Sequence, residues 1–164
     1  MRFKHVAICI SAGLTLWPTA AVANPEFDCF AEASPNVVTE GTNAQSFSVK
    51  VYNGPSLPAS VPIQEITTVR VIPPIGHVEA TSASAPHPWT DIRLLGSDPT
   101  EVRYRGGAIG VGGSHVFSYT GDVLVTTHPG LHTNAYLVRG SVGTTSTRAC
   151  LPVRPGALDL TINP

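Results

Sequence analysis

The chain has 164 residues, of which 42% are hydrophobic and 13% are charged, and its formal net charge at pH 7 is −1. This length and composition are typical of one packed domain and exclude a disordered, highly charged chain. The basic residues form no run in the sequence, so its composition does not favour binding to nucleic acid or to an anionic membrane, which need clustered positive charge.

The first residues have the pattern of a secretory signal peptide. Two basic residues precede an apolar core at 6–16, and Ala21-Val22-Ala23 fits the small-residue cleavage site of such signals. The apolar core is too short for a stable membrane span. We therefore expect residues 1–23 to be removed and residues 24–164 to form a single secreted or periplasmic domain, with no membrane span in the mature chain.

Short strands are predicted along the rest of the chain. The 15 glycines and 15 prolines interrupt it too often for helices of ordinary length. Between them, apolar residues such as Phe47, Val49 and Val51 alternate with polar ones, which places one face of a strand in a core and the other in water. Strands are predicted at 27–33, 45–52, 63–72, 90–95, 100–105, 114–120, 122–127, 134–139, 146–153 and 157–162. Their number and spacing predict an all-β, antiparallel β-sandwich with long proline-rich loops at 53–62 and 73–89.

Cys29 and Cys150 lie near the two ends of the expected mature chain. In an oxidising compartment such a pair favours a disulfide that staples the fold. A redox-active or metal-binding thiol pair is the alternative, although the C-x-x-C spacing typical of those sites is absent.

The glycine-rich stretch 101–119 does not have the pattern of a nucleotide-binding loop. A phosphate loop needs Gly-Lys-Ser/Thr, but Gly112-Gly113 is followed by Ser114 with no lysine nearby. A dinucleotide fingerprint opens a helix, whereas His115–Tyr119 is β-branched and aromatic and predicts a strand. The stretch is therefore predicted to be two strands separated by a turn or bulge.

His128 and His132 in "TTHPGLHT" are the candidate metal ligands. Pro129 and Gly130 exclude a helix, but a turn can bring two imidazoles together, and neutral imidazole suits copper, zinc or nickel. The alternative is that both are exposed loop histidines.

No catalytic site is expected. The sequence has no nucleophile-elbow pattern of the G-x-S-x-G type. The four acids that could form an acid–base pair are instead expected at strand ends and turns. His87 is expected to pack or stack near Trp89, and two further histidines are expected to stand alone. The acids are Asp91, Asp98, Glu101 and Asp122, and the lone histidines are His77 and His115.

The order of several short motifs resembles the YcnI-like family of exported bacterial domains. The motifs are "TEGTNAQSFSVKVYNG" (39–54), "TTVRVIPPIG" (67–76), "HPW" (87–89), "TEVRYRGGAI" (100–109) and "GGSHVFSYTGDV" (112–123). The resemblance spans about residues 28–150. It implies an immunoglobulin-like sandwich and a role linked to copper handling.

The chain departs from that family at the copper ligands. The resemblance implies a copper brace built on an N-terminal histidine, with a tryptophan near the end of the domain. Here the expected mature end is Asn24-Pro25, the matching position on the first strand is Phe30, and no tryptophan follows Trp89. Cys29 and Cys150 fall near the two places where the ligands would lie, so a disulfide would link the same strands.

These observations predict an exported, non-catalytic binding or accessory domain with no cofactor and an unidentified protein or small ligand as its partner. One alternative is a weak copper or other metal binder that uses loop histidines. Another is an extracellular adhesion or assembly module whose strand edges pair with partners.

Overall fold

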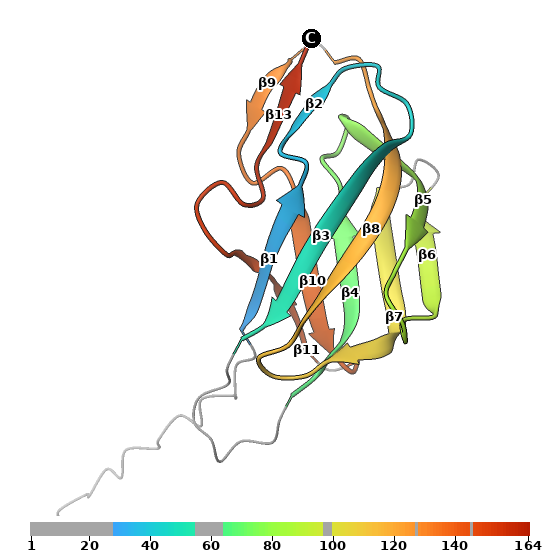
Figure 1. The fold of residues 1–164 in the computed structure, drawn as a ribbon, viewed down its shortest axis with the longest axis vertical. Coiled ribbons are helices and arrows are strands. Elements are labelled where there is room, and N and C mark those ends of the chain that lie inside the picture. Colours follow the sequence, from blue (N-terminus) through green and yellow to red (C-terminus); the bar gives the residue numbers. More distant parts are fainter. Residues whose placement is uncertain (1–27, 55–63, 97–99, 127, 145) are drawn as a thin grey trace, which may run out of the picture.

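The computed structural model describes residues 28–54, 64–96, 100–126, 128–144 and 146–164, which form strands joined by turns (Figure 1). The predicted signal segment, most of the loop predicted at 53–62, and Asp98 lie outside these residues. Within the described residues, no helix is long and apolar enough to cross a membrane.

The first layer is a five-stranded sheet in the order β12-β1-β3-β8-β5. Its strands are β1 (Cys29–Ser34), β3 (Gln45–Asn53), β5 (Val78–Ser84), β8 (Ser114–Val123) and β12 (Leu151–Pro152). All neighbouring strands are antiparallel except β1 and β12, which pair in parallel.

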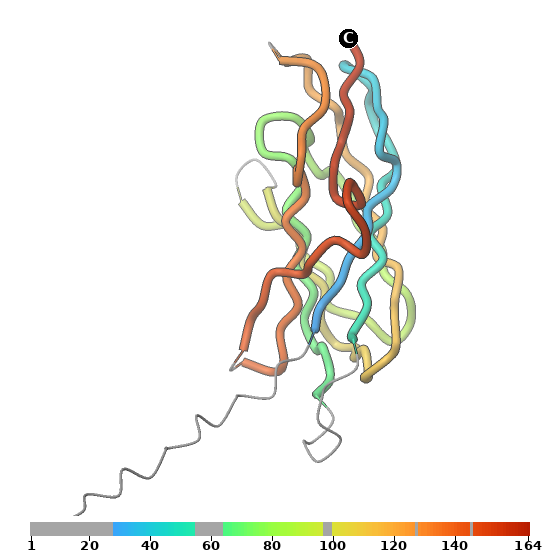
Figure 2. The backbone as a smooth tube through the Cα atoms, turned by 90° about the vertical axis from the view of Figure 1, so that its left-hand side faces the viewer, coloured from blue at the N-terminus to red at the C-terminus, as the bar shows by residue number. Residues whose placement is uncertain are grey.

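The second layer is a five-stranded antiparallel sheet in the order β11-β10-β4-β7-β6. Its strands are β4 (Ile66–Ile72), β6 (Asp91–Leu95), β7 (Glu101–Ile109), β10 (Leu137–Val142) and β11 (Ser146–Ala149). A small third sheet at the end of the molecule near the C-terminus joins β2 (Val37–Thr39), β13 (Leu160–Asn163) and β9 (Gly130–His132). Figure 2 shows the two main layers edge-on, with the C-terminal segment crossing between them.

The core lies between the two layers and is filled by alternate residues of their strands. Val49 and Val51 of β3 and Val69 and Val71 of β4 are fully buried, as the alternation in the sequence predicts. Tyr104 on β7 also bridges the layers, because its hydroxyl donates to the carbonyl oxygen of Ser118 on β8 at 2.9 Å. The predicted all-β sandwich is therefore confirmed.

The glycine-rich stretch has the predicted strand–turn–strand form, since β7 and β8 are joined by a turn at 110–113. A register shift between β4 and β7 falls next to Gly106, whose φ of +86° favours glycine. Asn53, at the end of β3, fastens the turn to the first sheet. Its side-chain amide donates to the carbonyl oxygens of Ile109 and Gln64, and its backbone carbonyl accepts from Gly112.

Three predictions about the strands are wrong. The strand predicted at 146–153 is two strands, β11 and β12, because the chain passes from the second sheet to the first between them. The loop predicted at 73–89 contains β5, because the sequence "VEATSAS" has few large apolar residues to reveal its alternation. The strands predicted at 114–120 and 122–127 are one strand, β8, which runs through Gly121. A Cβ atom there would lie 2.8 Å from the carbonyl oxygen of Glu79, so glycine allows close pairing with β5 rather than ending the strand.

Candidate functional site

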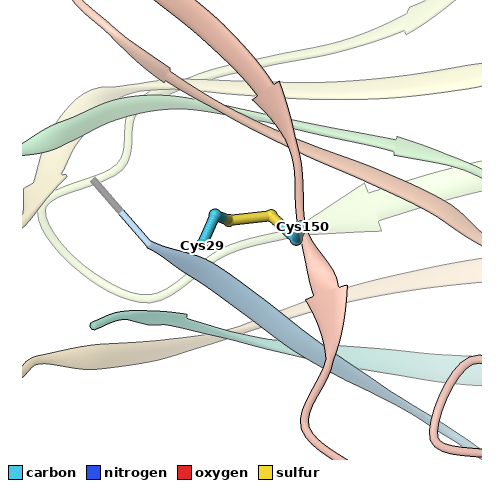
Figure 3. The surroundings of a disulfide bond; sticks show 2 residues. All are labelled: Cys29 and Cys150. Atoms are coloured by element: carbon cyan, nitrogen blue, oxygen red, sulfur yellow. A yellow bond between two sulfur atoms is a disulfide. The ribbon is translucent and has the colours of Figure 1, made fainter. Parts of the chain in front are cut away.

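The predicted disulfide between Cys29 and Cys150 is present (Figure 3). Cys29 begins β1 in the first sheet, and Cys150 lies where the chain leaves β11 of the second sheet for β12 of the first. Both residues are buried, and Gly140 beside them leaves room, since a Cβ atom there would lie 3.0 Å from the sulfur of Cys29. The bond therefore fastens the point at which the chain passes between the two layers.

His132, predicted to be a metal ligand together with His128, also contacts His77. The ring centroids of His132 on β9 and His77 in the turn before β5 are 4.2 Å apart, with the planes tilted by 47°. The Nε2 atom of His132 is 3.1 Å from the backbone oxygen of His128. The expectation that His77 stands alone is therefore wrong.

Burial is the main cause that lowers the pKa of His77, and the nearby His132 and His128 lower it further. Glu40 acts in the opposite direction. Its Oε1 atom is held at 3.0 Å by the backbone N–H and the hydroxyl of Thr126. The Nδ1 atom of His77 is buried and has no hydrogen-bond partner among the described residues. We refer to His77, His128, His132 and Glu40 as the histidine cluster.

The histidine cluster does not form a closed metal site. Among the residues that the structure describes, no group of three or more His, Cys, Asp or Glu side chains could hold a metal ion. Structural metal sites commonly use four protein ligands and catalytic zinc sites three. The ring contact brings His77 and His132 together, and metal binding by His128 and His132 stays a prediction.

A second aromatic cluster surrounds Trp89. Its indole N–H donates to Nδ1 of His115 at 2.7 Å, and its ring stands edge-on to Phe117 at a centroid distance of 4.9 Å. The same ring lies against Gly107, where an added Cβ atom would come within 2.7 Å of it. His115 is therefore a structural partner of Trp89 and not isolated, whereas His87 is exposed.

The three described acids of the proposed set lie at or near strand ends, as expected. Glu101 begins β7 and is paired with Arg70, and Asp91 begins β6 and accepts a hydrogen bond from Arg93 at 2.8 Å. Asp122, one residue before the end of β8, accepts from the backbone N–H of Ala44 at 2.8 Å. Each of the three therefore has a structural partner.

No family model and no curated protein sequence matches the chain. Solved structures do resemble its fold. An uncharacterized protein from Nocardia farcinica, described as having an immunoglobulin-like fold, aligns with a TM-score of 0.50 and 15% identity over 84% of this chain and 99% of its own. A candidate membrane-anchored protein of Corynebacterium diphtheriae aligns with a TM-score of 0.50 and 12% identity over 85% of this chain. This chain spans only 36% of that second protein's length. At such identities the comparison concerns the fold, and it shows that the chain is an immunoglobulin-like β-sandwich.

Proposed function

We propose that this chain is an exported, non-catalytic binding or accessory domain, related to copper-handling YcnI-like proteins but without their copper brace. The observation that carries the proposal is the disulfide between Cys29 and Cys150. Disulfides persist in the oxidising compartments outside the cytosol. The bond joins the first strand to the late segment, which are the two places where the resemblance would place copper ligands. Its two sulfur atoms are bonded to each other and so are not thiolate ligands for copper.

The edges of the sheets do not favour the adhesion alternative. Strand addition needs a long, flat and uncovered edge. The edge strands β11, β12 and β6 of the two main sheets have four, two and five residues. The edge strand β5 has seven residues but its pairing with β8 is interrupted between Ala80 and Ser82. A partner is therefore better sought on a face of the sandwich than along an edge.

Expression of the full chain in a bacterial host tests the proposal. The expected product is released with the periplasmic fraction and has the mass of a chain that begins at Asn24. It shows no free thiol after denaturation without reductant. A product that stays in the cytoplasm with residues 1–23 attached, or that carries two free thiols when isolated from the periplasm, would contradict it.

The contact between His77 and His132 favours one second candidate, a weak copper site at the histidine cluster. Titration of the mature protein with Cu(II), followed by electron paramagnetic resonance, separates the two candidates. A copper site predicts that His77→Ala and His132→Ala each weaken binding at least tenfold, while His87→Ala, on an exposed side chain, leaves it unchanged. Equally weak binding by the parent and the three variants would rule out the copper site and favour the binding domain without one.

A further inference from the structure

Four arginines from four neighbouring strands form a row across the second sheet. In the strand register, Arg139 on β10 is paired with Arg70 on β4, Arg70 with Arg103 on β7, and Arg103 with Arg93 on β6. Directly paired residues project from the same side of a sheet. The neighbours of Arg70 along the strand are buried in the core, so the row projects outward.

Arg105 joins the same side, because it lies two residues after Arg103 on β7. We refer to these five residues as the arginine face: Arg70, Arg93, Arg103, Arg105 and Arg139. The five strands of this sheet contain two carboxylates, Glu101 and Asp91, which are paired with Arg70 and Arg93. Like charges placed directly opposite one another destabilise a sheet. The surplus of positive charge is therefore a cost that an anionic ligand would relieve.

The arginine face contains a hollow of about 280 Å³. Three arginines line it together with the hydroxyl residues Thr68, Ser141 and Thr147; the arginines are Arg70, Arg103 and Arg105. Thr68 and Ser141 are 8% and 6% exposed, and the hydroxyls of Ser141 and Thr147 are 2.9 Å apart. The Nε atom of Arg103 is buried and has no hydrogen-bond partner among the described residues. A buried donor without a partner is costly, so the hollow favours an acceptor.

The chemistry of the hollow fits a sulfate or phosphate group. Guanidinium groups bind tetrahedral oxyanions through two parallel hydrogen bonds, and nearby hydroxyls can donate further ones. The row of four arginines spans three interstrand spacings, or about 14 Å, which is longer than a single anion. A chain with repeated charges would therefore engage more of the face than one ion can.

We propose that the arginine face binds a linear anionic polysaccharide carrying sulfate or phosphate groups, with one such group in the hollow. The inference rests on the proposed role as a binding domain and names the ligand class. Nucleic acid carries phosphate as well, but its single strands are bound largely by stacking on aromatic side chains. The residues that line the hollow include none, and threonine and serine hydroxyls suit sugar hydroxyls instead.

Binding of the mature protein to dextran sulfate and to dextran phosphate, measured by calorimetry at several salt concentrations, tests the proposal. The two polymers share a backbone and identify which anion is preferred, and unmodified dextran measures any contribution of the sugar alone. The double variant Arg103→Gln/Arg105→Gln should bind at least tenfold more weakly, and the slope of log K against log salt should fall by about two. The matched double variant Lys50→Gln/Arg154→Gln removes the same charge elsewhere and should bind like the parent.

Thermal melts of the two glutamine double variants show whether they fold. A third double variant, Arg103→Lys/Arg105→Lys, should keep the salt slope but bind more weakly, because lysine lacks the guanidinium fork. The proposal is overturned if neither charged dextran binds, if the two glutamine variants weaken binding equally, or if single- or double-stranded DNA binds as tightly as the better dextran. None of these outcomes bears on export or on the thiol count, so the proposed function is tested separately.

Discussion

At the residue scale, two histidines that the sequence presents as isolated have defined partners. His115 accepts the indole N–H of Trp89, and His77 lies against His132. Both contacts join segments distant in sequence, and strand pairing determines which segments meet. A sequence pattern could therefore locate the His128 and His132 pair, which is local, but could not place His77 beside it.

The stability of the protein should fall between about pH 7.5 and about pH 5.5, partly because of His77. Burial first, and then the neighbouring histidines, lower its pKa in the folded state. As the pH falls through the unfolded-state value of about 6.5, the unfolded chain takes up a proton that the folded protein does not, so the free energy of unfolding decreases. Well above that pH the group has no such effect. Urea denaturation of His77→Gln should show a shallower decrease than the parent.

The lowered pKa of His77 can also be measured directly on its imidazole. NMR titration should place the pKa of His77 below its ordinary value, and His132→Gln should raise it, because one of the lowering neighbours is removed. An unchanged pKa in that variant would show that His132 does not influence His77.

At the scale of elements, strands with large apolar residues at every second position could be predicted, and strands of small or few residues could not. The alternation of Phe47, Val49 and Val51 marks β3 clearly. The strand β5 and the three-residue strands β2 and β9 have no such pattern, and they form because a neighbouring strand offers them backbone partners. The motifs "HPW" and "RGG" also gain a common explanation, because the ring of Trp89 lies on Gly107.

Gly107→Ala should therefore displace Trp89. The new Cβ atom would come within 2.7 Å of the ring, which is too close for both groups to stay in place. Such overpacking should lower the free energy of unfolding by roughly 1–3 kcal/mol. The change should also appear in the near-ultraviolet circular dichroism of Trp89. Gly110→Ala is the matched control, since a Cβ atom there meets nothing within 4 Å, and it should leave both signals close to those of the parent.

At the scale of the whole molecule, the sequence predicts the sandwich and the disulfide but not the distribution of charge over the surface. The formal net charge of −1 and the lack of a basic run suggest that no basic surface exists. The arginine face forms because the register of four strands aligns residues from 70 to 139 in one row. Register depends on turns, bulges and the whole core, so a window of sequence cannot reveal such a row.

The disulfide is the contact whose loss should affect the whole sandwich most. It closes a loop with a sequence separation of 121, for which the chain-entropy model predicts a stabilisation of about 4–5 kcal/mol. Cys29→Ala/Cys150→Ala should lower the free energy of unfolding by that order, as measured by urea denaturation. The parent protein in reducing buffer should show a similar loss, which separates the effect of the bond from that of the side chains. The strand β12 pairs with β1 through only two residue positions, so hydrogen exchange should rise there first. The free energies of unfolding of the variant and of the reduced parent could instead lie within about 1 kcal/mol of that of the oxidised protein. The disulfide would then contribute little, and the core alone would hold the two layers together.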